Sequence, residues 1–125
     1  MKQVIIIKLG GSILTYKKTG GGIRKSFVRD VVGEIALAYK KLSPLCSFVV
    51  LHGAGSLGHP LVRAHRLAGA RLSSRTISGF AETVISVGKL TNLLADSFRR
   101  AGIPSVPLQT RLCFRRDVRG SVFLS

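Results

Sequence analysis

Two short glycine-rich segments, each directly after a run of apolar residues, are the parts of this sequence best suited to chemistry. One is residues 10–12, after the apolar run 4–9, and the other is residues 53–58, after the run 48–51. Glycines let backbone N–H groups approach phosphate oxygens, and a helix that follows adds the positive end of its dipole. Loops at the carboxyl ends of neighbouring strands converge at one edge of an open α/β sheet. Together the two segments predict a phosphate site, although either one alone could be an ordinary turn.

Three basic side chains accompany these segments. Lys8 ends an apolar run, where an ammonium group is unfavourable unless it reaches an anion or extends to water. Lys17 follows the first segment and, taken alone, would be a solvated surface charge. His59 closes the second segment, where it could donate a hydrogen bond to a phosphate, although an isolated histidine is more often structural. We expect these three side chains to converge on one phosphoryl group, with His52 structural and His65 on the surface.

The known nucleotide-binding patterns describe neither segment. Neither contains the Gly-Lys-Ser/Thr of a P-loop after four spacers, and neither follows the dinucleotide fingerprint. The two cysteines, Cys46 and Cys113, show no metal-ligand or disulfide spacing. We therefore expect them to be buried free thiols, and we expect no metal ligands from this chain.

Alternating strands and helices are predicted to position these groups. Near-continuous apolar character predicts buried parallel strands at 4–9 and 48–51. Helices are expected at 26–42, capped by Ser26 and ended by Pro44, and at 77–101, followed by a left-handed Gly102. Shorter strands are expected at 106–108, 112–114 and 122–124, with a hairpin turn at 117–120. This order predicts an α/β fold with a mainly parallel sheet sandwiched by helices.

The two segments and their neighbours resemble the amino acid kinase superfamily. The shared parts are Lys-Leu-Gly-Gly-Ser at 8–12, the lysine at 17 and the second glycine loop at 52–58. The ending Gly58-His59-Pro60 resembles the isopentenyl phosphate kinase branch and separates it from acetylglutamate, aspartate and uridylate kinases. Residues 101–109 also resemble that branch, so the resemblance covers nearly the whole chain.

The resemblance implies an amino acid kinase-like fold and transfer of the ATP γ-phosphate onto isopentenyl phosphate, giving isopentenyl diphosphate for isoprenoid synthesis. Lys8, Lys17 and His59 would be catalytic. His59 would also hydrogen-bond the acceptor phosphate, and Ala54 would line the substrate side of the second loop. No general base would be needed, because the acceptor is already an anion. The nucleotide would be held by Lys8, Leu9, Gly10, Gly11, Ser12 and Gly55.

Other features follow from the same resemblance. An apolar wall for the isoprenoid tail would come from the helix that carries Phe80, Val84 and Val87, although these residues could equally be ordinary core. Tyr16 stands where the family usually has an aspartate that orients the lysines, so Lys17 is expected to act less efficiently. Family members continue for about as long again past the region that matches this chain, with the segment that encloses ATP and Mg²⁺.

Residues 1–125 are therefore expected to be a single, apparently truncated N-terminal lobe that binds the phosphate acceptor, with the C-terminal nucleotide-binding lobe absent. The cofactors implied are ATP and Mg²⁺. The expected partners are isopentenyl phosphate, ATP, and either a second copy in a homodimer or a complementary C-terminal half.

The charge balance leaves a second class of function open. Twenty Lys and Arg against five Asp and Glu give a net charge of +15, which attracts phosphates of any kind. The basic residues are spread along the chain and only 6% of residues are aromatic, so no RNA-stacking or zinc-finger pattern is present. The alternatives are a non-catalytic basic binder of nucleic acid or polyphosphate, and a kinase of the same fold for another small phosphorylated acceptor.

The sequence gives no sign of a membrane segment. No apolar run approaches the roughly 20 residues needed to span a bilayer. The basic start and short apolar run resemble a signal peptide only superficially, since a lysine and two glycines follow at once. We expect a cytoplasmic protein without membrane contact.

Overall fold

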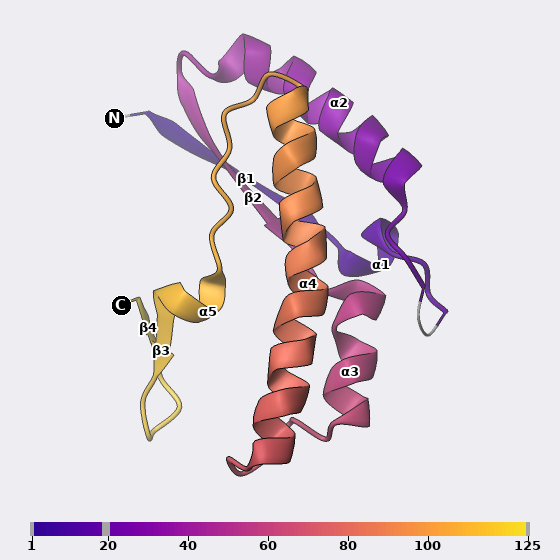
Figure 1. The fold of residues 1–125 in the computed structure, drawn as a ribbon. Helices are drawn as coiled ribbons and strands as arrows, with labels where there is room; N and C mark the ends of the chain where they lie inside the picture. Colours follow the sequence, from indigo (N-terminus) through magenta and orange to yellow (C-terminus); the bar gives the residue numbers. More distant parts are fainter. Residues whose placement is uncertain (1, 19–20, 125) are drawn as a thin grey trace.

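The computed structural model describes residues 2–18 and 21–124, which form strands and helices of a mixed α/β fold (Figure 1). In chain order they are β1 (Gln3–Leu9), α1 (Gly11–Leu14), α2 (Lys25–Leu42), β2 (Cys46–His52), the 3₁₀ turn η1 (Gly55–Leu57), α3 (His59–Ala64), α4 (Ser74–Arg100), α5 (Thr110–Cys113), β3 (Phe114–Arg116) and β4 (Val122–Leu124).

Strands β1 and β2 form a parallel pair, joined by the crossover helix α2 (Figure 1). Their register runs from Gln3 opposite Cys46 to Leu9 opposite His52, so both strands end at the same sheet edge. The two glycine segments begin at this edge, as the sequence predicted. The mixed α/β architecture with a parallel strand pair confirms the expected fold class.

The hydrophobic core lies between one face of this strand pair and helices α2 and α4. Leu14 and Leu90 are fully buried, and Val28 and Val32 supply the inward stripe of α2 at helical spacing. Leu90 and Phe98 supply the corresponding buried face of α4. Burial of these side chains fixes α1, and with it the first glycine segment, against the rest of the fold.

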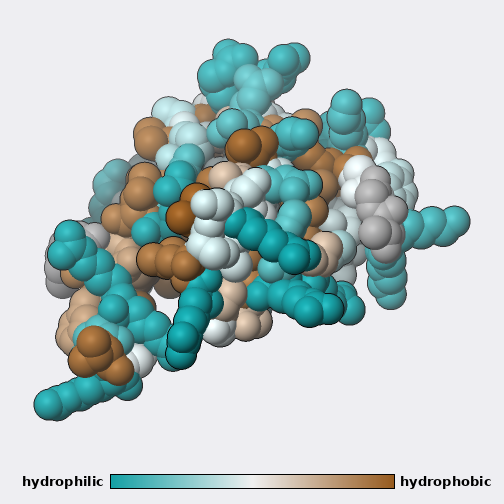
Figure 2. Space-filling model, turned by 60° about the horizontal axis from the view of Figure 1, so that its bottom comes forward, coloured by the Kyte–Doolittle hydropathy of each residue, from teal (hydrophilic) through white to brown (hydrophobic). Residues whose placement is uncertain are grey.

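The other face of the strand pair is open, so the prediction of fully buried strands was wrong: alternate residues of β1 and β2 are exposed. Side chains alternate across a strand, so the residues next to the buried ones point away from the core. Among the described residues, those on this face are exposed although most of them are apolar: Val4, Ile6, Lys8, Ser47, Val49 and Leu51. Figure 2 views the molecule from another side, the bottom of Figure 1, where long hydrophilic side chains also project between exposed apolar patches.

Both long helices occur where they were expected, with different starts. Helix α2 begins at Lys25, and Ser26 lies inside its first turn, so the expected Ser26 cap is wrong. Helix α4 begins at Ser74, because Ser73 and Thr76 form a reciprocal capping box there. Its end matches the prediction: Gly102 adopts φ 81°, in the left-handed region.

The C-terminal segment departs more from the predictions. Residues 106–108 form no strand, and they run as extended chain along α4 (Figure 1). Residues 112–114 were expected to be a strand, but α5 occupies 110–113 and β3 starts only at Phe114. Strand β4 matches the expected bounds and pairs antiparallel with β3. The hairpin turn at 117–120 is also confirmed, and the Asp117 carboxylate accepts hydrogen bonds from the Arg119 and Ser121 amides.

None of the helices in the described residues combines the length and the apolar character that crossing a membrane requires.

Candidate phosphate-binding site

The two glycine segments meet backbone to backbone. The Gly53 amide donates a hydrogen bond of 3.0 Å to the Leu9 carbonyl, which joins the ends of β1 and β2. A Cβ atom on Gly11 would lie 2.7 Å from the Gly55 Cα and 2.9 Å from the Gly53 carbonyl carbon, closer than real Cβ contacts. Gly55 adopts φ 54°, where glycine is favoured. The contact therefore needs glycine on both sides, which explains why the two segments share this composition.

The Thr15 side chain forms hydrogen bonds to both loops. Its side chain is almost fully buried, with 2% of its surface exposed. Its hydroxyl donates to the Gly11 carbonyl at 2.8 Å and accepts a hydrogen bond of 3.0 Å from the Ser56 amide. The Ser56 hydroxyl in turn donates to the Gly21 carbonyl at 3.1 Å. One buried threonine thus links segments about forty residues apart in the chain.

A cavity of about 370 Å³ opens above this junction. Its walls come from α1 and the loop after it, from the second glycine segment with η1, and from the first turn of α3. The residues that line it are Gly11, Ser12, Thr15, Lys17, Gly53, Gly55, Ser56, His59, Pro60 and Arg63.

Several of the predicted site residues share this cavity. Lys17 and His59, proposed as catalytic, both line it, and so do Gly11, Ser12 and Gly55. Lys17 reaches it from the loop after α1, and His59 is the first residue of α3. The pairing of a lysine and a histidine from distant segments around one cavity is the arrangement that the sequence led us to expect.

Four other predicted residues lie outside the cavity lining. Leu9 is a core residue, with 4% of its surface exposed, so only its backbone faces the loops. Gly10 precedes α1 and is half-buried. Ala54 is half-buried, and its Cβ is next to Gly58. Lys8 is exposed on the open face of the sheet.

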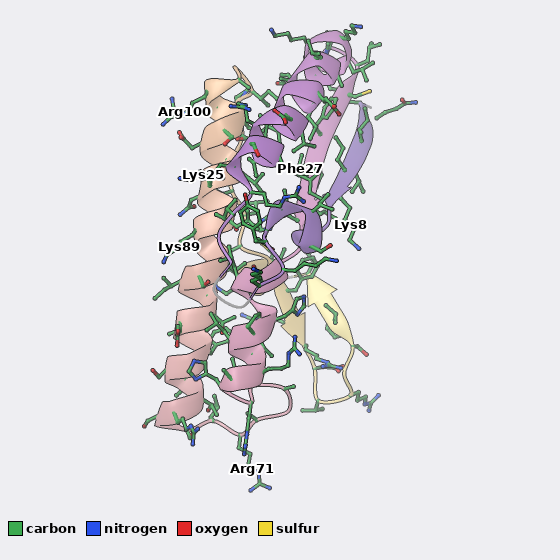
Figure 3. All side chains as sticks on the ribbon, turned by 90° about the vertical axis from the view of Figure 1, so that its right-hand side faces the viewer. Lys8, Lys25, Phe27, Arg71, Lys89 and Arg100 are labelled. Carbon is green, nitrogen blue, oxygen red and sulfur yellow. The ribbon has the colours of Figure 1, made fainter. Side chains whose placement is uncertain are left out.

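The position of Lys8 follows from strand geometry. Leu9 points into the core, so the preceding side chain must point to the opposite face. Figure 3 shows Lys8 on the side of the sheet that faces away from α4. The structure therefore brings Lys17 and His59 together at the cavity and leaves Lys8 at the neighbouring face.

Sequence reasoning missed three polar residues of the cavity: Thr15, Ser56 and Arg63. For Arg63 a signal was present, because it lies four residues after His59 on a helix, and residues at this spacing share one face. For Thr15 and Ser56 there was none, since their hydrogen bond depends on how the two loops pack.

Two other histidines support the scaffold. The His52 ring bonds the Thr91 hydroxyl at 2.9 Å, which fastens the end of β2 to α4, as expected of a structural histidine. His65 was expected at the surface, but its ring packs against Gly79 and lies 2.7 Å from the Glu82 carboxylate. The ring is thus half-buried at the surface, because α3 packs against α4 and covers most of it. Both contacts hold the second loop and α3 in place beside the cavity.

The site is strongly basic. Its lining includes Lys17, His59 and Arg63, and no carboxylate occurs among the described residues that line it. The carboxylates lie in other parts of the fold. Asp96, at the far end of α4, accepts hydrogen bonds from Arg99 and Arg100, and these bonds, first that from Arg99, lower its pKa. With backbone amides, hydroxyls and cations around one opening, the cavity can bind and neutralise a phosphate.

A second, larger groove of about 960 Å³ lies between β2, α4 and the C-terminal segment. Phe80, Val84 and Val87, which the sequence suggested as an apolar wall, line this groove. The Val87 side chain also approaches Gly58 at the second loop, where a Cβ would lie 3.2 Å from it. The groove and the basic cavity are therefore both in contact with the second glycine loop.

Comparison with known proteins agrees with this geometry. The chain matches the amino acid kinase family over residues 3–121. It is 36% identical over 111 residues to the isopentenyl phosphate kinase of Methanothermobacter thermautotrophicus, a match that covers 85% of this chain and 40% of that protein.

Two solved isopentenyl phosphate kinases have similar structures. One superposes with a TM-score of 0.77 at 32% identity, over 91% of this chain and 47% of the other. The T. acidophilum enzyme, solved as a product complex, gives a TM-score of 0.70 at 26% identity, over 96% of this chain and 47% of the other. The chain thus spans less than half the length of these relatives. From its sequence and its fold, the chain belongs to the amino acid kinase family.

Proposed function

We propose that this chain provides the phosphate-acceptor lobe of an ATP-dependent kinase that converts isopentenyl phosphate to isopentenyl diphosphate. The observation that carries the proposal is the shared cavity of Lys17 and His59 at the junction of two glycine loops. The similarity to isopentenyl phosphate kinases supports the choice of acceptor.

In this proposal His59 donates a hydrogen bond to the phosphate of the acceptor, and Lys17 neutralises charge that develops on the transferred phosphoryl group. The backbone of Gly10, Gly11 and Ser12 lies against that group, and Gly55 lies on the nucleotide side. The acceptor is an anion and needs no deprotonation, so positioning and charge neutralisation are sufficient. Ala54 would contact the acceptor through the backbone of the second loop.

Lys8 has a different place in the proposal. Its side chain lies on the open face of the sheet, beside the end of β1, and it is fully separate from the lining of the cavity. Its four-carbon stem would have to bend round the strand end to reach a phosphate held above Gly10 and Gly11. We propose that it contacts the nucleotide phosphates from that side, with Lys17 as the principal ammonium group of the acceptor cavity.

ATP is the phosphate donor in this proposal, and Mg²⁺ would accompany it. The described residues do not form a magnesium site themselves: they contain no cluster of three or more His, Cys, Asp or Glu side chains. Magnesium prefers carboxylate oxygens together with substrate phosphates, whereas the described lining of the cavity is cationic.

We also propose an apolar environment for the isoprenoid tail along α4. The large groove beside the second loop has the required character, with Phe80, Val84 and Val87 in its wall. Each of these residues is at least partly exposed, so a hydrocarbon chain could contact them. Burial of its methylene groups would favour binding by about 0.8 kcal/mol for each CH₂.

The open face of the sheet supports the expectation that this lobe packs against another polypeptide. Val4, Ile6, Val49 and Leu51 are between 42% and 65% exposed, and together they form an apolar surface on neighbouring strands. A second copy of the chain or a complementary nucleotide-binding lobe would cover it. Light scattering at several protein concentrations distinguishes a homodimer from a monomer.

Titration calorimetry with isopentenyl phosphate tests the acceptor site. Loss of a hydrogen bond to a charged group costs about 1.5–3 kcal/mol, so Lys17→Ala and His59→Ala should each weaken binding by roughly 10-fold or more. Lys18→Ala is the matched control, because it removes the same charge from the next residue, which lies outside the cavity lining. Equal affinities for Lys17→Ala and Lys18→Ala would count against the proposal.

The net charge of +15 favours one rival, a non-catalytic binder of nucleic acid or polyphosphate. Such binding depends on many scattered cations and weakens steeply with salt. The proposed site instead predicts binding that depends on His59 at 150 mM salt. The other rival is a kinase of this fold with a different phosphorylated acceptor. Competition between isopentenyl phosphate and other small phosphomonoesters distinguishes it from the proposed function.

A further inference from the structure

Arg63 is a cation of the cavity that the function proposed above does not use. It lies on α3 one helical turn after His59, and residues four apart on a helix share a face. Both side chains line the cavity, together with Lys17 from the loop after α1. The α3 backbone is held by packing against α4 and by the bond between His65 and Glu82. The two basic side chains of α3, His59 and Arg63, therefore both lie at the cavity.

The Arg63 guanidinium has no competing anion among the described residues. The ion pairs found there join Asp30 to Arg29, Glu82 to His65, and Asp96 to Arg99 and Arg100. The carboxylate of Asp117 is engaged by backbone amides of its own turn. An arginine that faces a basic cavity without such a partner has its N–H donors available for a ligand.

We propose that Arg63 is a binding residue for the acceptor phosphate and sets a preference for a phosphomonoester dianion. A guanidinium group presents N–H donors in a planar fork that matches two phosphate oxygens at once, whereas an ammonium group acts as a point charge. His59 and Arg63 would contact the acceptor phosphate from α3, and Lys17 would face it from the opposite wall. A carboxylate has only two oxygens, which the guanidinium fork alone can engage, and an alcohol has no anionic oxygen, so the pair of donors favours a phosphate over either. The identity of this acceptor rests on the function proposed above, but the anion contact of Arg63 does not.

The test measures binding of methyl phosphate and of isopentenyl phosphate by calorimetry to the full chain at 150 mM salt. Arg63→Ala should weaken binding of both ligands by about 10- to 100-fold, the range expected when a charged hydrogen-bonding group is removed. Arg63→Lys keeps the charge and loses the fork, so it should recover only part of the affinity. Arg71→Ala is the control. It removes one charge from an exposed residue that lies far from the cavity at the tip of the molecule (Figure 3), and at this salt its field is screened beyond about 8 Å.

The outcomes separate this inference from the proposed function. Equal affinity of wild type, Arg63→Ala and Arg71→Ala overturns the role of Arg63, while dependence on His59 in the same titrations would leave the proposed function standing. If methyl phosphate binds with full dependence on Arg63 but the isopentenyl group adds no affinity, the inference holds and the assigned acceptor is wrong. If the wild-type chain binds neither phosphate, both are overturned. Circular dichroism of each variant, with Arg63→Lys as the conservative change, shows whether a loss of binding reflects unfolding.

Discussion

Replacement of Thr15 by valine tests whether the two loops are joined as the structure indicates. The change keeps the side-chain shape and removes the hydroxyl, which bonds both Gly11 and Ser56. The Gly11 carbonyl keeps a second bond of 3.1 Å from the Thr15 amide. The Ser56 amide, which lies in a half-buried loop, loses its hydrogen bond to the Thr15 hydroxyl.

The expected cost is set by that amide. An unpaired buried donor costs about 1–3 kcal/mol, and the added methyl group offsets roughly 0.8 kcal/mol by its burial. We therefore expect Thr15→Val to lower the free energy of unfolding by about 1–2 kcal/mol. For a domain of this size, that change lowers the melting temperature by roughly 4–10 °C. Thr15→Ser keeps the hydroxyl and should recover most of the loss.

Thermal unfolding followed by circular dichroism measures the effect, with Thr83→Val as the matched control. The Thr83 hydroxyl is half-buried and donates only within its own helix, to the Gly79 carbonyl at 2.8 Å. Its replacement should change stability by no more than about 0.5 kcal/mol. If Thr15→Val and Thr83→Val melt at the same temperature, the threonine does not hold the loops together and the described junction is wrong.

Four further substitutions test the same structure. Gly11→Ala should destabilise the chain by about 1–3 kcal/mol, because the added Cβ would overlap the second loop. Gly33→Ala should instead stabilise α2 by up to about 1 kcal/mol, because a Cβ at Gly33 would meet open space. Urea denaturation measures both changes in the free energy of unfolding. Leu90→Ala should cost about 2–5 kcal/mol in the same assay, because the side chain is fully buried in the core. The Arg99 side chain holds the pKa of Asp96 below its ordinary value, so the ionised carboxylate stabilises the fold at pH values above that ordinary pKa, and this stabilisation is lost as pH falls through the lowered pKa. Arg99→Ala should raise the pKa of Asp96 toward its ordinary value in an NMR titration. An unchanged pKa would contradict the contact.

The local pattern of the sequence determined the elements and the place where chemistry could occur. Apolar runs followed by glycine predicted β1, β2 and the two loops, because a buried parallel strand and a tight phosphate turn each need those residue types. Helical spacing of apolar residues predicted α2 and α4. The apolar spacing did not predict where α4 begins, because the Ser73 capping box sets that position.

The tertiary structure decided which of these groups share a site. Strand alternation directs Lys8 to the open face because Leu9 fills the core, while the packing of α1 and α3 around the joined loops brings Lys17, His59 and Arg63 to one cavity. The bond between Thr15 and Ser56 joins residues that are forty-one positions apart, and no local pattern encodes such a contact. Local propensity acts over a few residues, whereas the partner of a buried hydroxyl depends on how distant segments pack.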